Sequence, residues 1–431
     1  MTDQQTPNYD DAEALRKRKD YPSALKQFSQ IWQQNPSPFV GWRYAFCLRK
    51  VGQLKNSEQV AREALEKYPE DRFTKSELGW ILYEKELKPA KEDNNLHNAI
   101  SAANQILELN SDGIALAKTV LAVMKIAKGR KNWSILLHWA DRIAPDALDD
   151  KPMIFDGKRG MSDRETWYVG RARALLELGR SNEARQFART GLTEFPDEIF
   201  LLRTSALALA SSGDIAGGIA EMRSLLAHRR ASWYMKAELA ELEHQLGNYD
   251  EAYRLICDAV SSSGQSEEYK LKYFESLAQI ALALGKLDVA AEHIALAKAI
   301  RSSESWRIPS DLVKVENDVL VALQSSGKTW PELPQDPRQL GRLCSQRWKE
   351  GKDTGKQFYS GTVKDYPEGR HFAFIKRDDG GEDVYVIVRD LPRNCNRSDS
   401  RVEFTLKTSY DQKKERESTQ ATSIRCSKEY L

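Results

Sequence analysis

Leu246-Gly247-Asn248-Tyr249-Asp250-Glu251-Ala252 is the clearest copy of a phrase that recurs in this chain of 431 residues. Its glycine follows Gly179 and Gly213 at a constant spacing of 34 residues, and a further copy holds Gly285. A glycine accepts the left-handed turn after a helix. The small residue five positions later lets the second helix pack closely on the first. The period therefore predicts pairs of helices joined by glycine turns.

A 34-residue period with this layout resembles the tetratricopeptide repeat. The resemblance implies an α-solenoid, because a single helix pair cannot bury its apolar face alone. Weaker copies continue upstream, and we expect the array to cover residues 1–325, with a possible break at 145–163. In one upstream copy the turn is expected to be swollen by the charged stretch 85–95.

Solenoids of this family hold extended peptides or partner helices in a concave groove, so the resemblance also implies a protein or peptide partner. The groove is lined by recurring positions of the repeat. In this chain those positions include Arg173, Arg203, Tyr234, Glu241 and His244. They do not repeat the Lys/Asn arrangement that clamps a chaperone's C-terminal carboxylate, and that ligand is not expected.

The last part of the chain changes from a helical period to strict alternation. Gly361-Thr362-Val363-Lys364 is followed by His371-Phe372-Ala373-Phe374-Ile375-Lys376, an Asp/Gly turn, and Asp383-Val384-Tyr385-Val386-Ile387-Val388. Two alternating runs around such a turn predict a β-hairpin. Successive strand side chains point to opposite faces, so Phe372, Phe374 and Tyr385 share one face. Exposed aromatic rings beside cations can stack unpaired bases and hold phosphates.

These runs resemble the cold-shock domains of the OB-fold class. Val402-Glu403-Phe404 and Gln420-Ala421-Thr422-Ser423-Ile424 complete five matched blocks, in the family's order, over residues 358–426. The resemblance implies a small all-β OB-fold barrel over residues 357–431 that binds single-stranded RNA or DNA. Its candidate interface residues are Lys364, Tyr366, Arg370, His371, Phe372, Phe374, Lys376 and Tyr385.

The binding face departs from the family pattern in several places. The first stacking Trp is Asp365, its neighbouring Phe is Tyr366, the two motif glycines are His371 and Ala373, and the closing His and Phe are Ile387 and Val388. Stacking is worth ~1–3 kcal/mol per base, so these losses weaken binding. The alternative is a barrel that keeps the fold and binds protein.

Residues 326–356 are expected to form a linker with a short basic helix. Prolines between 331 and 337 deny a continuous helix across the first part. Residues 339–349 can form a short helix that carries Arg342, Arg347 and Lys349. This basic stretch could extend the nucleic-acid path, and the alternative is a solvated tether.

The composition of the chain limits the cellular compartments and the partners that we expect for it. A formal net charge of +2, from 65 basic and 63 acidic residues, means that affinity for nucleic acid must be local. The 5 cysteines are scattered and form no Cys-x-x-Cys, which favours a reducing cytoplasm and argues against a disulfide framework. Neither a secretory signal nor an apolar run of the ~18 residues that a membrane span needs is present. We therefore expect a soluble cytoplasmic protein with no membrane partner.

Catalytic motifs are absent from the sequence. The lysines of Gly327-Lys328-Thr329 and Gly355-Lys356 lack the remaining residues of a phosphate loop, and no His-Glu-x-x-His or Gly-x-Ser-x-Gly occurs. The sequence thus predicts no catalytic residue, no metal and no cofactor. The expected function is a non-enzymatic adaptor that joins a protein partner to single-stranded nucleic acid, by analogy in stress response or phage defence. The alternative is a pure protein-interaction scaffold, and the oligomeric state is not predicted.

Overall fold

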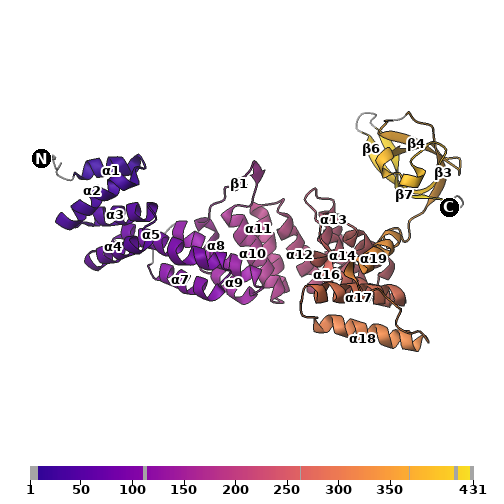
Figure 1. Cartoon of the computed structure of the whole chain (residues 1–431), viewed down its shortest axis with the longest axis horizontal. Coiled ribbons are helices and arrows are strands. Elements are labelled where there is room, and N and C mark those ends of the chain that lie inside the picture. The colour runs from indigo at the N-terminus through magenta and orange to yellow at the C-terminus, as the bar shows by residue number, and fades with distance from the viewer. Residues whose placement is uncertain (1–7, 110–113, 263, 368, 412–415, 428–431) are drawn as a thin grey trace. The chain divides into compact units, whose positions relative to one another are not determined.

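The computed structural model describes residues 8–109, 114–262, 264–367, 369–411 and 416–427. Most of them are helical, and a small β-barrel follows the helices (Figure 1). Contacts divide the chain into two compact units, Met1–Ala231 and Ser232–Leu431, and the barrel falls in the second. Each unit is described by itself below.

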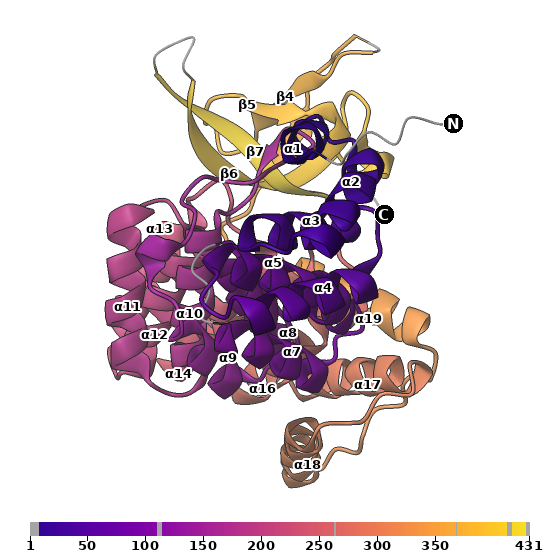
Figure 2. The same ribbon diagram turned by 90° about the vertical axis from the view of Figure 1, so that its left-hand side faces the viewer.

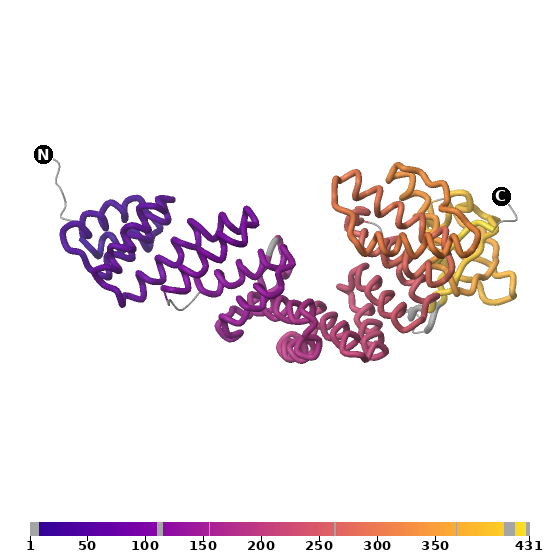
Figure 3. The backbone as a smooth tube through the Cα atoms, turned by 90° about the horizontal axis from the view of Figure 1, so that it is seen from below, coloured from indigo at the N-terminus to yellow at the C-terminus, as the bar shows by residue number. Residues whose placement is uncertain are grey.

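In the first unit most helices form pairs joined by short turns, as the backbone trace shows (Figure 3). The first helices of the pairs are α1 (Tyr9–Lys17), α3 (Pro38–Lys50), α5 (Arg72–Leu82), α8 (Ile114–Gly129), α10 (Asp163–Glu177) and α12 (Ile199–Ser211). Their partners are α2 (Tyr21–Gln34), α4 (Leu54–Lys67), α7 (Leu96–Glu108), α9 (Trp133–Ala140), α11 (Ser181–Glu194) and α13 (Ile215–Leu226). From α3 to α12, each first helix also contacts the first helix of the next pair, which makes one continuous layer.

The repeated phrase acts as its residues predict. Gly179, Gly213, Gly247 and Gly285 all have positive φ, between 68° and 109°, which an L side chain adopts only under strain. At Gly218, five positions after one of these turns, a Cβ atom would lie 2.7 Å from the Cβ of Ala210 on the preceding helix. The small residues therefore set the close approach within each pair.

The third pair differs from the expected swollen turn. Residues 85–92 continue the first helix, because α5 runs into a π-helical turn, η1 (Tyr83–Leu87), and then into α6 (Lys88–Glu92). The turn to α7 is confined to residues 93–95. The charged side chains of this stretch thus lie on a helix, where their spacing is fixed.

The expected break at 145–163 is an irregular segment with a short hairpin between α9 and α10. It contains a 3-10 turn, η2 (Pro145–Ala147), and the two-residue strands β1 (Ile154–Phe155) and β2 (Lys158–Arg159). Ser162 then starts α10 with a capping box to Glu165. The packed core continues across this segment, since α10 contacts both α8 and α9.

In the second unit the helical part comprises α14 (Trp233–Gln245), α15 (Tyr249–Val260), a 3-10 turn η3 (Glu267–Lys270), α16 (Leu271–Ala283) and α17 (Leu287–Ser303). Two further helices follow, α18 (Ser310–Ser325) and α19 (Pro337–Gly351). α18 lies along α17 and also contacts α16 (Figure 1).

The helix expected within the linker is part of the packed array rather than a solvated tether. α19 packs against α15 and α17, with Leu340, Cys344 and Trp348 buried. The indole of Trp348 stacks on the ring of Phe274, at 5.5 Å between centroids and 10° between planes. A Cβ atom at Gly351 would collide with Cys257 and Tyr253, so α15 and the end of α19 meet at a glycine. Because α19 belongs to the packed array, only a short segment without regular structure precedes the barrel.

The barrel is closed and five-stranded, in the order β3-β4-β5-β7-β6. Its strands are β3 (Tyr359–Val363), β4 (Phe372–Arg377), β5 (Val384–Ile387), β6 (Arg401–Asp411) and β7 (Arg416–Cys426), with 3-10 turns η4 (Val388–Asp390) and η5 (Arg393–Cys395) between β5 and β6. β5 and β7 are parallel and the other neighbours are antiparallel; β6 and β7 form long paired arms (Figure 2). Apolar side chains fill the interior, among them Val363, Ile375, Val386, Val402 and Phe404.

The cysteines argue against a disulfide framework, and the described residues hold one disulfide. Cys395 and Cys426 are joined by a disulfide across a sequence separation of 31 residues. Cys395 ends η5 and Cys426 ends β7, and Cys426 pairs with Val402 of β6. The sequence gives no sign of the pairing because these residues meet only when the barrel closes. Cys47, Cys257 and Cys344 are free and buried.

Candidate nucleic-acid interface

Three aromatic side chains form one cluster on the outer face of β4 and β5. The rings of Phe372 and Tyr385 are stacked, with centroids 5.7 Å apart and planes at 30°. Phe374 meets both edge-on, at 6.1 Å and 6.2 Å. Phe374 is 42% exposed, whereas its neighbours Ala373 and Ile375 point into the core. Strand alternation therefore brings these rings together as the sequence predicts, and leaves an apolar surface in contact with solvent.

The strand register extends this cluster into a row across the sheet. Phe374 lies opposite Tyr385, and Tyr385 lies opposite Gln420 on β7. On the other side, the backbone N–H of Lys364 donates to the carbonyl oxygen of Phe374 at 2.8 Å. The row Lys364, Phe374, Tyr385 and Gln420 crosses four chain segments and combines a cation, two rings and an amide. Such a surface suits a strand of unpaired bases.

The cations around the rings are partly neutralised. The guanidinium of Arg370 lies over the ring of Phe372, 4.3 Å from its centroid. The ammonium group of Lys364 forms an ion pair with Asp383. Lys376 is exposed and forms no ion pair with any residue that the structure describes. Arg370 and Lys376 are therefore the cations most available to a phosphate.

Two other predicted residues lie differently. The ring of Tyr366 packs against the barrel core, and its hydroxyl donates to Asn396 Oδ1 at 2.8 Å, so it is held as a structural residue. His371 is exposed at the start of β4. Asp365, at the position of the family's stacking Trp, accepts a hydrogen bond from Ser398 Oγ at 2.7 Å.

The predicted groove residues fall in both units. Arg173 of α10 pairs with Glu177 at 3.1 Å and lies over the ring of Trp133, and Arg203 of α12 is nearly buried. In the second unit, Tyr234 lies edge-on to Trp233. Glu241 accepts hydrogen bonds from Ser276 and Lys272, at 2.7 Å and 3.2 Å.

His244 borders a cavity of about 320 Å³ between α14, α16 and α18, together with Leu282, Lys314 and Val315. Burial lowers the pKa of its imidazole, which favours the neutral form. The predicted groove residues of each unit therefore already contact other side chains of that unit.

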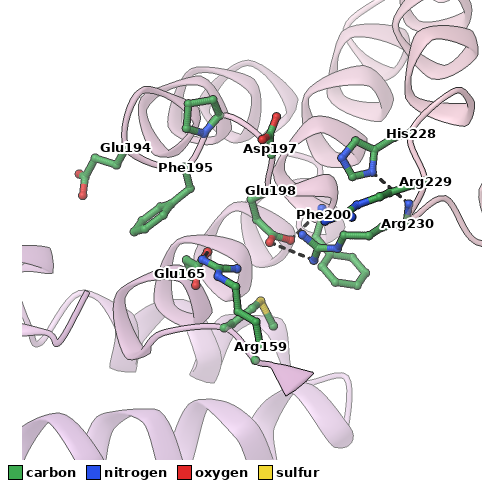
Figure 4. Close-up of a pocket in the computed structure, with 13 residues that line it drawn as sticks. Arg159, Glu165, Glu194, Phe195, Asp197, Glu198, Phe200, His228, Arg229 and Arg230 are labelled. Carbon is green, nitrogen blue, oxygen red and sulfur yellow. Dashed lines mark hydrogen bonds and ion pairs between the residues drawn. The ribbon is translucent and has the colours of Figure 1, made fainter. Parts of the chain in front are cut away.

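A larger cavity, of about 750 Å³, was not anticipated from the sequence. It lies beside the hairpin β1–β2, between the ends of α10, α11 and α13 (Figure 4). Its buried carboxylates each have an arginine: Glu165 pairs with Arg159 at 2.8 Å, and Glu198 pairs with Arg230 at 3.3 Å. The two buried carboxylates of this cavity are therefore satisfied within the protein.

Metal binding and thiol chemistry find no support among the described residues. No group of three or more His, Cys, Asp or Glu side chains is placed to hold a metal ion there. Burial raises the pKa of Cys47 and Cys257 to about 12, which disfavours the reactive thiolate. Of the helices that the structure describes, none has the length and apolar composition that crossing a lipid bilayer requires.

Comparison with known proteins finds the repeat family. A tetratricopeptide repeat model matches residues 203–265, and no curated protein matches the chain. A tetratricopeptide repeat protein from Parabacteroides merdae shares 13% identity over 63% of this chain and 96% of its own, with a TM-score of 0.32. YrrB, described as a TPR protein with an unusual peptide-binding site, shares 12% over 46% and 91%, with a TM-score of 0.32.

Human IFIT1, solved as a dimer with m7Gppp-AAAA, shares 15% identity over 73% of this chain and 72% of its own, with a TM-score of 0.39. The repeat match, the glycine turns and the strand order together give the architecture. The chain is a mostly α protein, a tetratricopeptide-like helical array followed by a closed five-stranded barrel.

Proposed function

We propose that this protein is a non-enzymatic adaptor whose barrel binds single-stranded RNA or DNA and whose helical array docks a protein or peptide. The observation that carries the proposal is the exposed cluster of Phe372, Phe374 and Tyr385 beside Arg370 and Lys376. An OB-fold of the cold-shock kind accounts for the strand order and for the five motif blocks, and OB-folds bind oligonucleotides on this sheet face.

Binding by this surface would be local rather than driven by bulk charge. Residues 357–431 hold 14 Lys and Arg against 13 Asp and Glu, which gives the barrel almost no net charge. Base stacking on the rings must then supply most of the affinity, at ~1–3 kcal/mol per base. The salt dependence should be shallow, because few phosphates are neutralised.

A second candidate function is the pure protein-interaction scaffold. It is favoured by Asp365 at the position of the stacking Trp and by the ion pair that occupies Lys364. The adaptor proposal also places the protein in the cytoplasm, in stress response or phage defence. The Cys395–Cys426 disulfide weighs against the cytoplasmic part, because disulfides rarely persist there.

Titration of the full-length protein with labelled oligopyrimidines tests the proposal. Phe374→Ala should weaken binding by ~1–3 kcal/mol without melting the barrel. Phe358→Ala is the matched control, because Phe358 carries an arginine over its ring but lies outside the cluster, beside Arg425 of β7. Equal affinities for wild type, Phe374→Ala and Phe358→Ala, or no binding by wild type, would favour the scaffold.

A further inference from the structure

The first unit holds a basic face that has no role in the proposed function. It lies where α5, the π-helical turn η1 and α6 form one continuous helix. The backbone N–H of Lys88 donates to the carbonyl oxygen of Tyr83, five residues earlier, and this defines the π-turn. Such turns are rare and occur frequently at functional sites.

Aromatic and basic side chains meet in a cavity at this π-turn. A space of about 450 Å³ is lined by Trp80, Tyr83, Glu84, Lys88, Lys91 and Glu92. The rings of Trp80 and Tyr83 meet edge-on, with centroids 5.7 Å apart, and both are partly exposed. Glu84 is held by Arg49, at 2.6 Å. The cavity therefore offers two rings, two lysines and the exposed carboxylate of Glu92 to a ligand.

The lysines of the neighbouring helix extend the positive face. Lys88 and Lys91 are three residues apart on α6, and Lys125 and Lys128 are three residues apart on α8, so each pair shares a helix face. α6 packs on α8. None of these four lysines forms an ion pair with a residue in the described part of the chain, whereas nearby Lys118 pairs with Asp163 at 2.8 Å.

Lys91 and Lys128 each lie close enough to other cations for their own charge to be disfavoured. Burial lowers the pKa of Lys91, the charges of Lys125, Lys118 and Lys88 lower it further, and the carboxylate of Glu92 partly opposes them. Burial also lowers the pKa of Lys128, together with the charges of Arg173 and Arg203. Unpaired like charges in one place destabilise the folded protein, and a polyanion would relieve the repulsion.

We infer that this face, formed by Trp80, Tyr83, Lys88, Lys91, Lys125 and Lys128, binds single-stranded nucleic acid. The lysines pair with phosphates, and the two rings offer their surfaces to unpaired bases. An acidic peptide would satisfy the lysines but would leave the rings of the cavity without a planar partner. The inference goes beyond the proposed function, which gives the array a protein partner only, and it does not depend on the barrel.

Fluorescence titration with labelled oligouridylate and oligothymidylate, at two salt concentrations, tests the inference. The background is full-length protein with Phe372→Ala and Phe374→Ala, which removes the barrel's cluster. We expect binding to persist, and Lys125→Glu/Lys128→Glu to weaken it about tenfold or more. The slope of log K against log salt should fall by about 1.4, ~0.7 for each lost phosphate contact.

The matched control is Lys26→Glu/Lys55→Glu. These lysines are exposed on α2 and α4, the second helices of their pairs, and form no ion pair with a described residue. The control therefore makes the same change of charge at a different place in the unit. Lys125→Gln/Lys128→Gln gives the same test without added negative charge. Ultraviolet cross-linking with mass spectrometry should place the label on Trp80 or Tyr83.

Equal affinities for the Lys125/Lys128 variants and the control would overturn the inference. So would polyglutamate that competes as well as the oligonucleotide, with no cross-link at Trp80 or Tyr83, because the face would then take an acidic protein segment. The barrel is tested separately: if Phe372→Ala/Phe374→Ala changes nothing while the lysine variants abolish binding, the proposed function fails and this inference stands.

Discussion

The indole Nε1 of Trp348 donates a hydrogen bond to Nε2 of His293 at 2.7 Å, and both side chains are buried. The other ring nitrogen of His293 lies 2.7 Å from the carbonyl oxygen of Val289, to which it can only donate. One nitrogen therefore accepts and the other carries the proton, which fixes a neutral tautomer. Burial accordingly lowers the pKa of His293 to about 4.

The first prediction is a loss of stability in acid. The pKa of His293 is about 4 in the folded protein and 6.5 in the unfolded chain. Because the unfolded chain binds the proton more tightly, the contribution is full above pH 6.5 and is lost as the pH falls towards 4, by about 3 kcal/mol. Urea unfolding of wild type and His293→Gln across this range measures the difference. A difference that stays constant with pH would contradict the prediction.

The second prediction concerns the anchor of α19. Trp348→Ala removes the stack on Phe274 and the hydrogen bond to His293, and should cost about 3–5 kcal/mol. Trp306 is 46% exposed, so Trp306→Ala should change stability by only about 0.5 kcal/mol. Calorimetric melting compares the two. Equal melting temperatures would mean that Trp348 does not anchor α19 to the array.

α19 shows where reasoning from the sequence reached its limit. The prolines before it indicate a loop, but Pro337 occupies the first turn of the helix, where its missing N–H costs nothing. Its partners Phe274 and His293 are distant in sequence, so only the folded array reveals that Trp348 is an anchor. The array itself followed from Gly179, Gly213 and Gly247, because a turn with positive φ leaves a local signal.

On the barrel face, too, some features could be predicted from the sequence and others could not. Alternation placed Phe372, Phe374 and Tyr385 together, since strand geometry fixes that relationship locally. The ion pair between Lys364 and Asp383 depends on how a loop closes, and the sequence does not show it. Likewise, no sequence pattern marked the π-turn at Tyr83. A π-turn holds one residue more than an α-helical turn, and this extra residue leaves the composition of the helix unchanged.

A third prediction follows from the turn at Gly247, where φ is 87° and no atom would contact an added Cβ. Gly247→Val should destabilise by about 1–3 kcal/mol through backbone strain alone. Gly247→Asn should cost less, because Asn tolerates the left-handed region. Thermal melting ranks the variants, and a Val variant as stable as wild type would contradict the assigned turn.

A fourth prediction is that the disulfide stabilises the barrel. Cys395 and Cys426 close a segment of 31 residues, and opening it should cost about 3–4 kcal/mol through the entropy of the unfolded chain. The double variant Cys395→Ser/Cys426→Ser and mild reduction of wild type should lower the melting temperature by the same number of degrees. The free Cys344 is buried, so Cys344→Ala should not alter the response to reductant. A reductant effect that persists in the double variant would rule out this disulfide as its cause.

A fifth prediction uses the ion pair on the barrel face. Asp383→Asn frees the ammonium group of Lys364, so binding of oligopyrimidines should strengthen and the salt slope should steepen by ~0.7 for one added phosphate contact. Asp390→Asn, beside Arg389 on η4, is the matched control. The same titration compares them. Unchanged affinity in Asp383→Asn would show that a strand does not pass Lys364.

Anchoring α19 also limits how far the barrel can travel. Only residues 352–358 separate the end of α19 from β3. Fully extended, a segment of that length spans about 25 Å. Two binding modules on so short a tether share an effective concentration in the millimolar range. A ligand that spans the barrel and the helices from α14 to α19 would therefore be retained through avidity, even where each contact alone is weak.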